Sequence, residues 1–264
     1  GRLHSLVFRK KWENLFIDYQ GNDPNIMNWL CNGVDISEYF VHFKGSFKGK
    51  AYDSDTPPRN FLRNAESCIP FVDFIAKTLE DKIKTGAIKL LGRLGECQMP
   101  HVAMPLLVEP SKPRLCHDDR YINLWMRDMP FTLEKLREVP RMVDRGAVLF
   151  SCDDKSGYDH VLLSESSQMY FGIVFGEWVM VYRTIPSGWK LSPYVYHQSL
   201  GMVVTSYLRS LQICTMQYVD DRPFVVNRKP SEVEEEFEFR QRCTIYAIFE
   251  DIVRSWLYIS YTKV

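Results

Sequence analysis

Apolar positions between residues 69 and 88 recur every three or four residues, with charged side chains between them. Val72, Ile75 and Leu79 share one face of a helix at this spacing, which is typical of an amphipathic helix packed against a core. Gly86 follows, and glycine commonly ends a helix because it adopts the left-handed backbone conformation easily. The pattern therefore predicts a helix that stops near Gly86.

Shorter apolar runs bounded by turn residues predict β-strands along the rest of the chain. They lie at Met104–Val108, Arg114–His117, Val148–Asp153, Met169–Phe175, Trp178–Ile185, Ile213–Gln217, Pro223–Val226 and Leu257–Tyr261. An apolar run from Tyr194 to Leu208 fits a helix after Pro193. Ser231 followed by Glu234 forms a capping-box pattern, which predicts a last helix from Glu232 to Trp256.

Composition sets wide limits on the class of protein. The chain of 264 residues is 45% hydrophobic and 14% aromatic, enough to bury a large core in one or two subdomains. Its seven cysteines are scattered without a Cys-x-x-Cys pair, so neither a zinc site nor a disulfide framework is indicated. We expect an intracellular protein, in the cytoplasm or nucleus. No apolar run has the length of a membrane span, and the N-terminus shows no signal-peptide pattern.

Two acidic pairs follow apolar, strand-like runs. One lies in Phe-Ser-Cys-Asp-Asp-Lys-Ser-Gly-Tyr at 150–158, the other in Tyr-Val-Asp-Asp at 218–221. A single acidic pair at a hairpin tip is usually a solvated turn. Two pairs on neighbouring strands could instead hold two Mg²⁺ ions, since Mg²⁺ prefers carboxylate oxygens and paired ions can clamp both oxygens of a phosphoryl displacement.

Two further motifs accompany these pairs. Pro-Ser-Gly-Trp-Lys-Leu-Ser-Pro occupies 186–193, and an R-x-x-x-D-x-R-x-x-N pattern occupies 114–123. With all four motifs in this order, residues 60 to 264 resemble the reverse transcriptases, and are most similar to those of long-terminal-repeat and tyrosine-recombinase retrotransposons. The resemblance implies an α+β fold of fingers and palm. The palm would have split βαβ character, with an antiparallel sheet and helices on one face.

The resemblance also implies a domain organisation. Residues 1–60 would be an N-terminal extension of unknown role, 61–146 the fingers, and 147–264 the palm. In the family the palm is followed by a primer grip, a helical thumb and often an RNase H domain. We expect these to be missing from this chain, and to be supplied elsewhere or by a partner subunit.

Metal ligands are carried over from the family residue by residue. Asp153 and Asp220 match the principal Mg²⁺ ligands, Asp221 the supporting acid, and Asp154 the residue that adds its backbone carbonyl. The preferred interpretation of the Asp154 side chain is nevertheless a solvated neighbour, and because both 153 and 154 are aspartate the register is open by one residue. Two ions are implied, for which Mn²⁺ can substitute. Lys263 resembles the lysine that protonates the pyrophosphate leaving group; the alternative is an exposed terminal lysine.

Nucleotide-binding residues follow from the same resemblance. Arg114 matches the fingers arginine that contacts the triphosphate, with Lys112 as a weaker companion, and the backbone N–H groups around Ser156 and Gly157 could cradle phosphate oxygens. Tyr158 matches the aromatic residue beneath the sugar that excludes a 2′-hydroxyl, or else is a core tyrosine. The family usually has a larger residue where Ser187 stands, whereas Gly188 keeps the backbone close to the nucleotide.

Two functions remain open at this point. One is an RNA-dependent DNA polymerase core that transfers nucleotides from dNTPs to a primer 3′-hydroxyl on an RNA or DNA template. The other is a catalytically inactive, domesticated module used for binding or as a scaffold. Lysine and arginine together number 33, as do aspartate and glutamate, so the formal net charge is zero. Proteins that bind a nucleic-acid backbone usually carry a basic excess, so either the basic residues gather on one face or the missing part of the enzyme supplies the contacts to the duplex.

Overall fold

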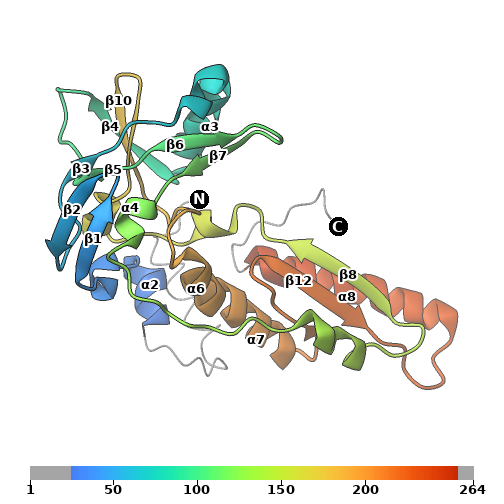
Figure 1. The fold of residues 1–264 in the computed structure, drawn as a ribbon. Helices are drawn as coiled ribbons and strands as arrows, with labels where there is room; N and C mark the ends of the chain where they lie inside the picture. Colours follow the sequence, from blue (N-terminus) through green and yellow to red (C-terminus); the bar gives the residue numbers. More distant parts are fainter. Residues whose placement is uncertain (1–24, 255–264) are drawn as a thin grey trace. The chain divides into compact units, whose positions relative to one another are not determined.

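The structure is a computed structural model that describes residues 25–254. These residues form two compact units, and the chain passes between them: residues 28–129 and 158–193 make the first unit, while residues 25–27, 130–157 and 194–254 belong to the second. Both units combine helices and sheets (Figure 1), which confirms the expected α+β class.

Three sheets build the first unit. β1 (Phe43–Phe47) and β2 (Lys50–Ser54) form an antiparallel hairpin, as do β6 (Leu106–Glu109) and β7 (Arg114–His117). A five-stranded sheet has the order β3 (Asn60–Phe61), β5 (Val102–Ala103), β9 (Gly172–Phe175), β10 (Trp178–Tyr182) and β4 (Ile88–Arg93). The turn between β9 and β10 contains Gly176 at a φ of 58°, a conformation that glycine adopts at little cost.

Short helices join these sheets, and one longer helix packs against β4 of the five-stranded sheet. They are α2 (Ile26–Asn32), η1 (Ile36–Tyr39), η2 (Glu66–Phe71), α3 (Val72–Thr85), α4 (Arg120–Asn123), η4 (Gly157–His160) and α5 (Glu165–Gln168). In α3, Ile75 and Leu79 are buried and Gly86 caps the end at a φ of 82°, so the amphipathic helix predicted from the spacing is confirmed. Edge-to-face contacts among Tyr52, Tyr121 and Trp125 connect the β1–β2 hairpin with the α4 region.

The second unit contains a three-stranded antiparallel sheet in the order β11 (Cys214–Thr215), β12 (Asp221–Val226) and β8 (Val148–Asp153). Its helices are η3 (Leu136–Arg141), α6 (Ser192–Tyr196), the π-helical turn η5 (His197–Gly201), α7 (Met202–Ser210) and α8 (Glu234–Arg254). Phe224 is fully buried and stacks on Phe150 with ring centroids 5.0 Å apart. Burying such a ring stabilises the fold by roughly 1.5–3 kcal/mol.

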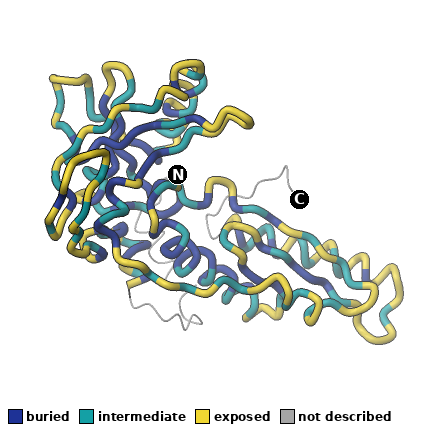
Figure 2. The backbone as a smooth tube through the Cα atoms, in the orientation of Figure 1, coloured by how far each residue is buried: buried dark blue, intermediate teal, exposed yellow. Residues whose placement is uncertain are grey.

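Buried and exposed positions alternate at the paired ends of β8 and β12 (Figure 2). Cys152 and Asp154 are buried while Ser151 is exposed, and on the paired strand Arg222 is buried while Asp221 is exposed. Because successive side chains of a strand point to opposite faces, the sheet has a covered face and an open face at the end that carries these residues. The covered face carries Asp154 and Arg222, and the open face carries Asp153 and Asp221.

Several sequence predictions need correction. The predicted helix after Pro193 forms, but a π-helical turn interrupts it. The predicted capping box is wrong, because Ser231 has a φ of 65° instead of the extended backbone of an N-cap. The predicted strand at Leu257–Tyr261 lies outside the described residues.

The compact units also differ from the expected division at residues 60 and 146. Residues 28–60 pack within the first unit. The β9–β10 hairpin, expected in the region 147–264, is part of the first unit's five-stranded sheet, where β10 pairs with β4 and β9 pairs with β5. Residues 130–146 belong to the second unit.

Candidate functional site: an acidic turn at the end of a sheet

Three aspartates lie at one end of the three-stranded sheet. Asp153, the last residue of β8, pairs directly with Asp221, the first residue of β12. Directly opposed residues of antiparallel strands have Cβ atoms roughly 4.5–5.5 Å apart, so these two carboxylates are neighbours on the open face. The expectation that the two acid-bearing strand ends lie side by side in one sheet is therefore confirmed.

Asp220 lies at the tip of a tight turn, the acidic turn Tyr218–Asp221. The backbones of Tyr218 and Asp221 exchange two hydrogen bonds, of 2.9 and 3.0 Å, so only Val219 and Asp220 form the tip. The backbone carbonyl of Asp220 also accepts a hydrogen bond of 3.1 Å from the amide of Asp154. The turn is thereby attached to the end of β8, and all three aspartates are held within a short stretch of the sheet.

Val219 has a φ of 56°, in the left-handed region that a β-branched residue rarely adopts. The side chain of Gln217, which is fully buried, supports this conformation. Its Nε2 donates to the carbonyl of Val219, and its Oε1 accepts a hydrogen bond of 2.9 Å from Thr205 on α7. The backbone amide of Gln217 donates to Glu134 at 2.7 Å. The strained turn is thus fixed by a buried amide that is itself held in place.

Like charges crowd around Asp220. The residue is exposed at the tip, yet partial burial of its carboxyl raises its pKa, and the negative charges of Asp153, Asp221 and Asp154 raise it further. A cation placed among these carboxylates would relieve the repulsion. The electrostatics of the turn therefore favour binding of a positive ion.

The donor set fits Mg²⁺. Within residues 25–254, no three His, Cys, Asp or Glu side chains already converge as a complete metal site. Mg²⁺, however, commonly takes only one or two protein carboxylates and fills its other positions with waters and substrate phosphates. Asp153, Asp220 and Asp221 supply such oxygens at one sheet end.

The carboxylate of Asp154 is already engaged. Asp154 is only 2% exposed, one of its oxygens accepts from Nη1 of Arg222, and the other accepts from the hydroxyl of Tyr196. The interpretation of its side chain as a solvated neighbour is therefore wrong. Strand alternation resolves the one-residue ambiguity: Asp153 faces the open side and Asp154 the covered side. Only the backbone carbonyl of Asp154 remains as a possible metal ligand.

The turn after β8 contains the Lys-Ser-Gly motif. Ser156 is exposed and has a φ of 54°, while Gly157 is buried. A Cβ on Gly157 would lie 2.8 Å from Cζ of Tyr196, so only glycine fits against that ring. Tyr158, the next residue, belongs to the first unit and is half-buried at the start of η4.

Arg114 and Lys112 lie in the β6–β7 hairpin of the first unit. Arg114 begins β7 opposite Glu109, and both basic residues are exposed. Neither forms an ion pair with any residue of the described part of the chain. Their cationic groups are thus presented to solvent, as binding of an anion requires.

The Pro-Ser-Gly-Trp-Lys loop of the first unit is clamped by Asn123. Asn123 donates to the carbonyl of Gly188 at 2.9 Å and accepts from the amide of Lys190 at 2.9 Å. A Cβ on Gly188 would lie 2.0 Å from the carbonyl oxygen of His117, so this position requires glycine. Ser187 is exposed at the head of the loop. The segment 114–123 and this loop therefore form one local structure.

Sequence reasoning missed four residues that support these groups, namely Tyr196, Gln217, Arg222 and Asn123. A signal was present for two of them, because Gln217 and Arg222 are large polar residues that flank the acidic turn within apolar runs. Such residues are buried only when they are paired or hydrogen-bonded. Lys263, expected to act on the leaving group, lies outside the described residues.

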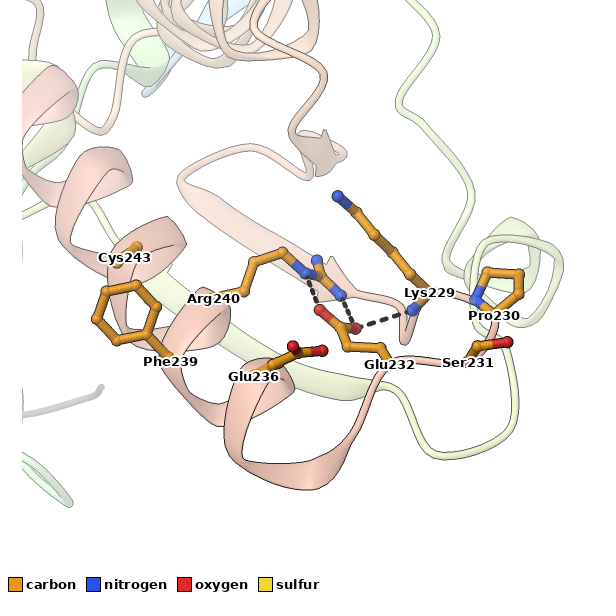
Figure 3. A pocket seen from close by; sticks show the side chains of 8 residues that line it. All are labelled: Lys229, Pro230, Ser231, Glu232, Glu236, Phe239, Arg240 and Cys243. Carbon is orange, nitrogen blue, oxygen red and sulfur yellow. Dashed lines mark hydrogen bonds and ion pairs between the residues drawn. The ribbon is translucent and has the colours of Figure 1, made fainter.

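A separate open pocket of about 530 Å³ lies where the chain enters α8 (Figure 3). Glu232 and Arg240 form a two-point ion pair beside it, and Phe239 and Cys243 line it from the helix. The pocket follows the end of β12 that is opposite Asp221. None of the expected site residues lines it.

Comparison of the sequence with known protein families gives no match, and no curated protein matches it significantly. Within residues 25–254, no helix combines the length and the apolar character needed to cross a membrane.

Proposed function

We propose that this chain is the fingers–palm core of an RNA-dependent DNA polymerase from a retroelement. The observation that carries the proposal is the pairing of Asp153 with Asp221 at the sheet end that also carries Asp220. Four motifs in the order found in reverse transcriptases support it. In this proposal the first unit corresponds to the fingers and the second to the palm.

The carboxylates of the acidic turn would hold the metal ions. Asp153 and Asp220 are the principal ligands and Asp221 assists, with the carbonyl of Asp154 as a further oxygen. Two Mg²⁺ ions, or Mn²⁺ in their place, would stabilise the attacking primer 3′-hydroxyl and the pyrophosphate leaving group. Buried support from Gln217 keeps the turn in one conformation, so the ligands need little reorganisation when the ions bind.

Nucleotide binding is assigned to residues that the family resemblance marks. Arg114, with Lys112 beside it, contacts the triphosphate, because an exposed guanidinium without an internal partner can bind phosphate oxygens in two-point fashion. The backbone N–H groups of Ser156 and Gly157 bind phosphate oxygens as well. Tyr158, Ser187 and Gly188 contact the rest of the nucleotide. Tyr158 excludes a 2′-hydroxyl, and Lys263 protonates pyrophosphate.

The partners are an RNA or DNA template with its primer and dNTPs. The chain has no basic excess, so a thumb or RNase H portion, on a longer chain or a partner subunit, would supply part of the grip on the duplex. The site of action is intracellular, in the cytoplasm or nucleus.

Primer extension on an RNA template tests the proposal. Asp153→Asn or Asp220→Asn should lower the rate of nucleotide addition about a thousandfold or more, because the amide keeps the volume but loses the charge that binds the ions. Asp144→Asn, at an exposed aspartate of the same unit, is the matched control and should extend at the parent rate.

Extension by Asp220→Asn at the parent rate would contradict the assignment. A parent chain that binds an RNA–DNA hybrid but adds no nucleotide, even with the thumb region restored, would favour the domesticated binding module.

A further inference from the structure

Beneath the acidic turn, on the covered face of the sheet, lies a fully buried cluster of three side chains: Asp154, Arg222 and Tyr196. Asp154 follows Asp153 and Arg222 follows Asp221, so each charged member of the cluster is adjacent in sequence to a proposed metal ligand. Arg222 is 0% exposed and pairs with Asp154, and Tyr196 donates to the same carboxylate from α6. The cluster thus joins the two acid-bearing strands to the helix that covers them.

Arg222 also reaches the π-helical turn. Its Nη2 donates to the carbonyl of Leu200 at 3.4 Å, and Leu200 lies in the π-helical turn between α6 and α7. The ring of Tyr196 lies against Gly157 in the turn that follows β8. Hydrogen bonds and an ion pair therefore join the end of β8, the start of β12 and the covering helix, and ring packing adds the Lys-Ser-Gly turn.

Stability alone is a poor reason for such a cluster. Taking two charges out of water is costly, and a buried ion pair can often be replaced by well-packed apolar residues without loss of stability. Among the described residues Nε of Arg222 has no hydrogen-bond partner, which adds to this cost. An apolar pair would fill the space, but it could not set the direction of the two strand ends.

We propose that Asp154, Arg222 and Tyr196 are positioning residues that hold the ends of β8 and β12, and with them Asp153 and Asp221, in the arrangement that binds metal ions. The proposal rests on the proposed function only in naming the ions as the ligand. The cluster itself touches neither substrate nor metal through its side chains. The carboxylate of Asp154 holds Arg222 and Tyr196, whereas in the proposed function the carboxylate of Asp153 binds metal ions. The two adjacent aspartates therefore have different roles.

The test replaces the charged pair by apolar residues in Asp154→Leu/Arg222→Leu. Two quantities are measured: amide hydrogen exchange at position 154, which reports opening of its bond to the carbonyl of Asp220, and Mn²⁺ affinity by electron paramagnetic resonance without nucleic acid. We expect the melting temperature to be retained, exchange to accelerate tenfold or more, and Mn²⁺ affinity to fall at least fivefold. Changes of less than twofold in both quantities would overturn the proposal.

Tyr196→Phe keeps the test decisive if the double variant does not fold. It removes one hydrogen bond and keeps the ring against Gly157, so exchange at position 154 should accelerate roughly fivefold, with a modest fall in the melting temperature from the lost bond. Unchanged exchange would overturn the proposal. Phe224→Leu is the control: it lies on the same covered face, should lower the melting temperature, and should leave exchange at position 154 within twofold.

An error in the proposed function gives a different experimental result from an error in the role of the cluster. If the parent chain binds no Mn²⁺, the assignment of the metal site is wrong, and amide exchange alone decides whether the cluster positions the strand ends.

Discussion

Asp220 lies among other negative charges, since Asp153, Asp221 and Asp154 all raise its pKa. Its neighbours Asp153 and Asp221 face the same open side of the sheet, and the turn that carries it contains a strained valine. Without a bound cation such a site destabilises the folded protein, because like charges repel and the backbone adopts a rare conformation. Strain and repulsion of this kind are commonly retained at functional sites, where a ligand offsets them.

Asp220→Asn should therefore raise the melting temperature slightly at pH 7 without divalent ions, since it removes one repelling charge. Added Mg²⁺ should raise the melting temperature of the parent chain but have a much smaller effect on the variant, because a ligand stabilises only the protein that binds it. Thermal denaturation with and without Mg²⁺ measures both effects. Equal Mg²⁺ shifts in parent and variant would show that Asp220 is not a ligand; Asp144→Asn should behave like the parent.

The carboxylates could be predicted from sequence because the signal is local: acidic pairs follow apolar runs at two places. The sequence could not predict which of these aspartates faces solvent and which is buried in an ion pair. Whether Asp153 or Asp154 faces the open side depends on which face the helices cover, and that is decided by α6 and η5, some 40 residues further along the chain. The burial of Arg222 could not be predicted either, because an arginine is buried only with a partner, and its partner Asp154 lies on another strand.

At the level of elements, local patterns predicted most of the regular structure. The helix ending at Gly86, the β6–β7 and β9–β10 hairpins and the strand Val148–Asp153 all form. The errors arise where side chains override the local signal. The capping box fails because Ser231 adopts a left-handed backbone conformation; in the turn before α8 the carboxylate of Glu232 instead accepts from the amide of Lys229 at 2.9 Å. The π-helical turn leaves no clear mark in the apolar spacing.

Glu232 offers a prediction about the α8 boundary. Arg240 donates two hydrogen bonds to it, and these lower the pKa of Glu232 from 4.5 to about 2. A carboxylate with a depressed pKa in the folded state stabilises the protein above its unfolded pKa and loses that contribution as the pH falls through the folded pKa. Glu232→Gln should thus lower the melting temperature at pH 7, with the difference shrinking between pH 4.5 and about 2.

Melting curves recorded from pH 7 down to pH 2 measure this. Glu236→Gln is the matched control, since Glu236 lines the same pocket and forms no ion pair with the residues described by the structure. A difference between parent and Glu232→Gln that stays constant with pH would contradict the role assigned to the Arg240 pair.

The division of the whole molecule into units was the least predictable feature. Sequence order places the β9–β10 hairpin after β8, so a linear reading assigns it to the same domain. In the structure β9 pairs with β5 and β10 with β4, contacts that join residues roughly 70 to 90 positions apart. Such pairings between distant segments depend on the whole fold and have no local signature. The neutral net charge likewise hides how basic residues are distributed between the units.

The most direct test of the proposed metal site is diffraction from crystals soaked in Mn²⁺, with data collected for the anomalous signal of manganese. We expect an anomalous peak on the open face of the three-stranded sheet, within coordination distance of the carboxylates of Asp153 and Asp220, and no peak beside the carboxylate of Asp154. Absence of a peak at Asp153 and Asp220 in well-diffracting, Mn²⁺-saturated crystals, or a peak on the side chain of Asp154, would contradict the metal site on which the proposed polymerase function depends.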